Sequence, residues 1–118
     1  MEFYENSQSP ERALLIGVDT GEYNDEISME ELALLSETAG AEIIGTVIQK
    51  LEAPSPATYI GSGRMAEVAA FCRNNDIDLI IADSELTPSQ INNIETKTAT
   101  RVVDRTMLIL DIFAARAR

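Results

Sequence analysis

Residues 78–90, DLIIADSELTPSQ, decide the fold. The first five residues, all apolar except Asp78, form a run of the kind that makes a parallel strand buried on both faces. The last four predict a helix start, with Thr87 as the N-cap, Pro88 at the first helical position and Gln90 three residues after the cap. A buried strand that leads directly into a helix is typical of an α/β domain with a parallel sheet.

The same alternation of strand and helix extends to both sides of this stretch. Residues 12–18 and 41–49 are apolar or β-branched and predict two strands, and residues 101–103 predict a short fourth one. Helices are expected over residues 28–39, 64–74 and 87–97, and from Thr106 onward. The fold class is therefore α/β, with a four-stranded parallel sheet flanked by helices.

The ends of two helices carry local signals. Ser28 and Glu31 form a capping-box pattern, and Gly40 can close the helix that they open. The stripe Met65, Val68, Ala69 and Cys72 gives the helix after residue 63 its apolar face. We expect residues 1–10 to be a flexible leader and residues 11–118 to form one domain. We expect its last helix to continue into a linker that this chain lacks.

The charge is strongly acidic and uneven. The 118 residues carry 20 acidic and 9 basic side chains, a net charge of −11. Residues 1–55 contain 12 acids against Arg12 and Lys50, so −10, which leaves −1 for residues 56–118. This balance disfavours broad electrostatic binding to nucleic acid, which normally needs a basic face.

The single cysteine, the absence of histidine and the lack of a long apolar run narrow the possible classes of protein further. The single Cys72 excludes an intrachain disulfide and, because it falls in a helical apolar pattern, is expected to be a core thiol of a cytoplasmic protein. Without histidine, the chain lacks the commonest general base and zinc ligand. No apolar run approaches the ~20 residues of a membrane span. We expect no catalytic residue and no cofactor in this chain.

The segment TYIGSG, residues 58–63, is a candidate site because it opens a helix at the carboxyl edge of the predicted sheet, where α/β domains bind ligands. Free amides there, with Arg64, suit phosphate, although the glycines also suit a plain turn. Tyr59 can stack on a base or pack under the loop. The candidates for contact with RNA or phosphate are Thr58, Tyr59, Gly61, Ser62, Gly63, Arg64, Arg105, Arg116 and Arg118.

Three aspartates follow predicted strands on the same edge: Asp19, Asp83 and Asp104. Clustered carboxylates can hold Mg²⁺. Aspartates in such places also serve as caps and loop formers, and we favour that structural role.

Three segments, in order, resemble the N-terminal domain of the HflX family of ribosome-associated GTPases. They are GTVIQKLEAPSPATYIGSGR (45–64), DSELTPSQ (83–90) with Asn93 and Glu95 after it, and VVDRTMLILDIFAARAR (102–118).

The resemblance implies that the full-length protein carries a helical linker and a GTPase domain that uses GTP and Mg²⁺. It also implies binding to the large ribosomal subunit and its rRNA, and ribosome splitting under stress. This chain has no P-loop, so it cannot be the GTPase itself. Two alternatives stay open: an ATP- or nucleotide-binding module at the carboxyl edge, and an intramolecular regulatory domain that packs on its own linker and GTPase domain without touching RNA.

Overall fold

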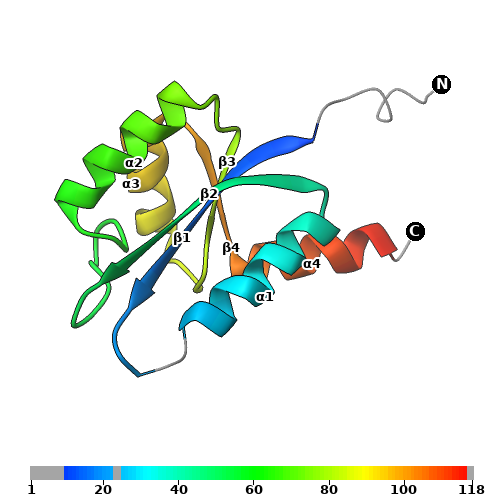
Figure 1. Ribbon diagram of the computed structural model, residues 1–118, viewed down its shortest axis with the longest axis horizontal. Coiled ribbons are helices and arrows are strands. Elements are labelled where there is room, and N and C mark those ends of the chain that lie inside the picture. Colours follow the sequence, from blue (N-terminus) through cyan, green and yellow to red (C-terminus); the bar gives the residue numbers. More distant parts are fainter. Residues whose placement is uncertain (1–9, 23–24, 117–118) are drawn as a thin grey trace.

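The computed structural model describes residues 10–22 and 25–116. It confirms the α/β prediction: four strands, all paired in parallel, alternate with four helices (Figure 1). The strand order is β2-β1-β3-β4. The elements are β1 (Glu11–Asp19), α1 (Asp25–Thr38), β2 (Ala41–Lys50), α2 (Ser62–Asn74), β3 (Leu79–Ala82), α3 (Pro88–Thr98), β4 (Arg101–Asp104) and α4 (Arg105–Arg116).

Helices cover the sheet on both faces. Alternate side chains of β1 and β3 enter two separate cores, since successive residues of a strand point to opposite faces. Leu14, Ile16 and Ile80 pack with α2 and α3, whereas Leu15 and Ile81 pack with α1 and α4. Each buried aliphatic side chain stabilises the fold by roughly 1.5–3 kcal/mol. The continuous apolar run of the central strands is therefore explained by burial on both sides.

The apolar stripe predicted for α2 is confirmed, because all four of its residues are buried. Burial raises the pKa of the Cys72 thiol, and a hydrogen bond with Thr100 opposes this shift. Cys72 is thus a core thiol, held in its protonated form at neutral pH.

The helix start that was predicted at Thr87 is confirmed in detail. The Thr87 hydroxyl accepts a hydrogen bond from the Gln90 amide (3.1 Å), and the Gln90 side chain accepts one from the Thr87 amide (2.9 Å). We expect Thr87→Ala to lower the free energy of unfolding by ~1 kcal/mol, because the Gln90 amide at the helix start loses its side-chain acceptor. Urea unfolding followed by circular dichroism measures this. Ser89→Ala, at an exposed position of the same turn, is the matched control, and an equal loss in both variants would contradict the capping role.

The predicted start of α1 is wrong. The helix begins at Asp25, so Ser28 lies inside its first turns and makes no capping box. Acidic Glu26 in the first turn suits the positive end of the helix dipole. The Ser28 hydroxyl donates instead to the Asp83 carboxylate (2.6 Å). At the other end, Gly40 takes φ +99°, the left-handed conformation expected of a residue that closes a helix.

Candidate functional site

The first half of TYIGSG is part of the protein interior. Thr58, Tyr59 and Ile60 are buried, and the Thr58 hydroxyl donates to the Ile60 carbonyl oxygen (2.8 Å). Tyr59 is 2% exposed and packs in the core beneath α2 and α3. It also takes φ +68°, which is uncommon for a residue with a side chain. Of the two roles predicted for Tyr59, the structure shows packing under the loop.

Tyr59 also occupies the place where a ligand crevice would open. In an open parallel sheet that place lies where the strand order reverses, here between the carboxyl ends of β1 and β3. The Tyr59 hydroxyl accepts a hydrogen bond from the Val18 amide (3.1 Å) and donates to the Ser84 hydroxyl (3.4 Å). The aromatic side chain therefore joins the two strand ends and fills the space between them.

The loop before Tyr59 is held in place by α3. The backbones of Ser55 and Tyr59 bond each other in both directions (2.9 Å each). From α3, the Gln90 side chain donates to the Ser55 carbonyl oxygen (2.8 Å) and the Asn93 side chain donates to the Ala57 carbonyl oxygen (2.9 Å). Two segments that carry the family resemblance, 45–64 and 83–95, thus form one structural unit at the carboxyl edge.

The second half of TYIGSG lies at the surface. Gly61 is the N-cap of α2, and its amide donates to the Gln49 side chain (2.8 Å). Ser62 and Gly63 are exposed in the first turn, and space around Gly63 is open. The Arg64 side chain is partly exposed and pairs with Glu67 (2.8 Å). Within the described chain, the amides of residues 62–64 have no hydrogen-bond acceptor among the protein atoms, as is usual for a helix N-terminus.

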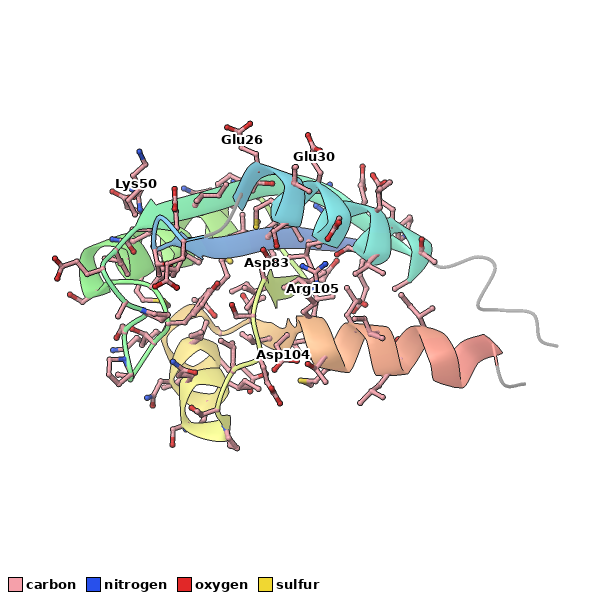
Figure 2. All side chains as sticks on the ribbon, turned by 90° about the horizontal axis from the view of Figure 1, so that it is seen from below. Glu26, Glu30, Lys50, Asp83, Asp104 and Arg105 are labelled. Carbon is pink, nitrogen blue, oxygen red and sulfur yellow. The ribbon has the colours of Figure 1, made fainter. Side chains whose placement is uncertain are left out.

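The predicted arginines differ in their surroundings. Arg105 joins α4 to the carboxyl edge: its guanidinium lies 2.6 Å from Asp83 Oδ1 and 3.1 Å from Glu31 Oε1, and it also donates to Ser28. Figure 2 shows Asp83 and Arg105 close together, whereas Glu26 and Glu30 point away from the sheet. Arg116 is the last residue of α4, and Arg118 lies outside the described residues. Contact of these arginines with RNA stays a prediction.

The three aspartates hold local structure. Asp19 accepts a hydrogen bond from the Gly21 amide (2.8 Å), which fixes a turn. Asp104, at the start of α4, accepts from the Met107 amide (2.9 Å) and the Leu86 amide (2.8 Å). Asp83 bonds Ser28 and Arg105. Across residues 10–22 and 25–116, no three acidic or cysteine side chains gather as they would to hold a metal.

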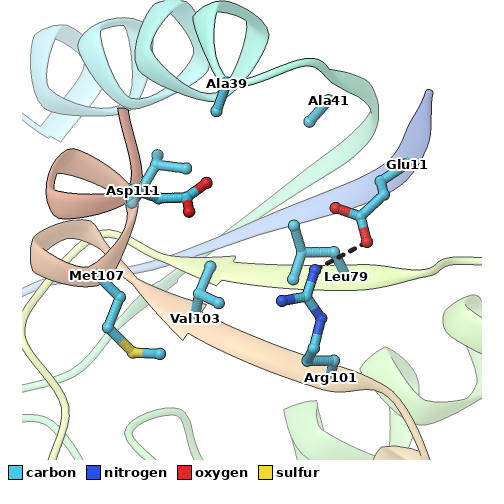
Figure 3. A pocket seen from close by; sticks show the side chains of 9 residues that line it. Glu11, Ala39, Ala41, Leu79, Arg101, Val103, Met107 and Asp111 are labelled. Atoms are coloured by element: carbon cyan, nitrogen blue, oxygen red, sulfur yellow. Dashed lines mark hydrogen bonds and ion pairs between the residues drawn. The ribbon is translucent and has the colours of Figure 1, made fainter. Parts of the chain in front are cut away.

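A partly enclosed hollow lies at the opposite, amino edge of the sheet, where strand starts, the turn after α1 and α4 line it (Figure 3). It measures about 180 Å³, and the paired Arg101 and Glu11 (2.8 Å) are among the residues that line it. The hollows at the carboxyl edge, beside Asp104 and beside Lys50, are open to solvent. The partly enclosed hollow is therefore not on the edge where α/β sheets bind nucleotides.

Sequence reasoning missed the residues that build the loop. Gln90 and Asn93 were visible only as a helix cap and as part of a family segment, and nothing in the sequence indicated their bonds to residues 55 and 57. Gln49 was visible only as part of a predicted strand and of a family segment, and nothing indicated its bond to the Gly61 amide. Separately, none of the helices within residues 10–22 and 25–116 is long and apolar enough to cross a membrane.

Comparison with known proteins is consistent with this geometry. Residues 26–114 match the family described as GTP-binding GTPase N-terminal. A relative named GTPase HflX from Caldanaerobacter subterraneus subsp. tengcongensis is 45% identical over 114 residues, covering 97% of this chain and 26% of that protein. The GTPase HflX of Escherichia coli K12 is 32% identical over 115 residues, covering 98% of this chain and 27% of that protein.

Solved structures show the same fold. A GTP-binding protein from the archaeon Sulfolobus solfataricus, in complex with GDP, superposes with a TM-score of 0.63 at 24% identity, over 88% of this chain and 30% of that one. The present chain spans about a quarter of the length of the curated relatives that it matches. With the family match covering most of its length, the chain belongs to the N-terminal domains of HflX-type GTPases.

Proposed function

We propose that this domain docks its GTPase on the rRNA of the large ribosomal subunit and positions the GTPase domain for ribosome splitting under stress. The GTP and Mg²⁺ belong to the GTPase domain of the full-length cytoplasmic protein. The observation that carries the proposal is the loop at the carboxyl edge, which Gln90 and Asn93 hold next to the exposed start of α2. Loops held by a rigid scaffold are common sites of recognition.

The distribution of charge favours this edge over the α1 layer. Residues 25–38, which form α1, carry five acidic side chains and no basic one. Such a surface repels phosphate at close range. The start of α2, with Arg64 and the amides of residues 62–64, offers donors to an anion. We therefore expect the domain to face the ribosome with its carboxyl edge and to keep α1 away from RNA.

Co-sedimentation with purified large ribosomal subunits over a series of salt concentrations tests the proposal. We expect saturable binding with a shallow salt dependence, since Arg64 is a single cation and each phosphate contact contributes a slope of only about −0.7 to −0.9. Arg64→Ala is expected to weaken binding and to flatten the slope. Lys97→Ala removes an exposed cation of α3 and serves as the matched control.

A second candidate is intramolecular regulation, and α4 supplies the observation that favours it. Met107 and Leu110 are 42% and 62% exposed on this helix, and an exposed apolar pair suits packing against another domain. If the domain acts only by intramolecular regulation, we expect a folded sample of the chain not to bind large ribosomal subunits at any salt concentration. That result would contradict docking. The nucleotide-binding alternative is disfavoured because Tyr59 fills the crevice that a nucleotide would need.

A further inference from the structure

Residues 52–57, EAPSPA, form an exposed tip on the loop at the carboxyl edge. All but Ser55 are exposed, so the tip adds no large side chain to either core. Its role in folding is small, yet the surrounding residues fix its backbone closely. This combination needs an explanation outside the stability of the domain.

The tip is restrained from three directions. Its base is closed by the two backbone bonds between Ser55 and Tyr59. Gln90 and Asn93 hold two of its carbonyl groups from α3. The Ser55 hydroxyl accepts from the amides of residues 57 and 58 (3.3 Å each). Two prolines restrict the backbone further, and the positive φ of Tyr59 is a strain of roughly 1–2 kcal/mol that these contacts hold.

The tip exposes mainly backbone hydrogen-bond acceptors and no positive charge. Pro54 and Pro56 have no amide hydrogen, and the amides of residues 55, 57 and 58 donate inside the loop. The carbonyl oxygens of residues 53, 54 and 56 accept no hydrogen bond from any described part of the chain. The exposed side chains are small and apolar except Glu52. The amides of residues 52 and 53 make no hydrogen bond with any described part of the chain. The tip therefore offers backbone acceptors, these two amides and apolar contact, and it offers no cation to a phosphate.

We infer that the tip docks in the shallow minor groove of an rRNA helix, an inference that rests on the proposed function above. That groove is wide and displays ribose 2′-hydroxyls, which donate hydrogen bonds to exposed carbonyl oxygens. Because the contact needs no positive charge, an acidic domain can make it. The tip supplies the part of binding that does not depend on salt, and Arg64 supplies the part that does.

The test uses this chain and purified large ribosomal subunits. The variant carries Ala53→Gln and Ala57→Gln, which place neutral bulk on two exposed positions of the tip and leave the charge unchanged. We expect binding about tenfold weaker, as for the loss of one or two hydrogen bonds, with the same salt slope as the wild type. Leu34→Gln, on the exposed surface of α1, is the control and should bind as the wild type does.

Acylation of rRNA 2′-hydroxyls gives the second readout. The wild-type domain is expected to protect a short run of riboses, and the tip variant should lose that protection while Arg64→Ala keeps it. If the tip variant binds large subunits as tightly as the wild type does, the inference is overturned and the proposed docking still stands. Absence of binding by the folded wild type would overturn both.

Discussion

Replacing Arg105 by alanine is expected to lower the free energy of unfolding by about 3 kcal/mol. The Asp83 side chain is only 6% exposed, and Arg105, itself 26% exposed, lies 2.6 Å from it. Removal of the guanidinium leaves a nearly buried carboxylate with the Ser28 hydroxyl as its remaining partner among the described residues. An unpaired buried charge is far more costly than the loss of an exposed ion pair.

Urea unfolding of Arg105→Ala measures this cost, and Arg101→Ala is its matched control. The Arg101–Glu11 pair is also short (2.8 Å), but its two side chains are 57% and 50% exposed. Its loss should change stability by less than about 1 kcal/mol. An equal loss of unfolding free energy in the two variants would show that the Asp83 carboxylate does not need Arg105 as its partner. A large effect for Arg105 alone assigns this residue to the link between α1, β3 and α4.

Replacing Tyr59 by alanine is expected to lower the free energy of unfolding by about 4 kcal/mol, as for other large-to-small changes in a core. The substitution removes an aromatic ring packed beneath α2 and α3 and opens the space between the ends of β1 and β3. It also removes the acceptor of the Val18 amide. The unusual φ of residue 59 remains, because alanine meets the same steric conflict as tyrosine.

Tyr59→Phe separates packing from hydrogen bonding. The phenylalanine keeps the ring and loses the hydroxyl that joins Val18 and Ser84, so we expect a cost of about 1–2 kcal/mol. Both variants are measured by urea unfolding followed by circular dichroism. If alanine and phenylalanine cost the same, the ring does not fill the crevice and a ligand site there would regain support.

Local patterns predicted the elements and missed the contacts between them. The strand at residues 78–82 and the Thr87 cap are determined by neighbours within a few positions, and both predictions hold. The start of α1 was misplaced because Ser28 bonds Asp83, which is 55 positions away. Tyr59 and Val18 are 41 positions apart, so the sequence could not decide between stacking and packing. Contacts between residues so distant depend on strand order, which periodicity does not specify.

Contacts with residues distant in the sequence also move the candidate site away from the first half of TYIGSG. A glycine pair before a helix indicates free amides, and Ser62 and Gly63 are indeed exposed at the start of α2. The preceding three residues read as part of the same motif, yet they fold into the core. What is left for recognition is the exposed part of the loop, residues 52–57, together with the start of α2.

Hydrogen–deuterium exchange of the domain with and without large ribosomal subunits tests the central claim most directly. The amides of residues 62–64 have no internal acceptor among the described residues, so they exchange quickly in the free domain and slow down when this edge is covered. The amides of residues 52 and 53 also lack an internal acceptor among the described residues. We expect slower exchange confined to residues 52–53 and 62–64, with α1 unchanged. Slowing confined to α1 and α4, or none anywhere at saturating subunit concentration, would contradict docking through the carboxyl edge.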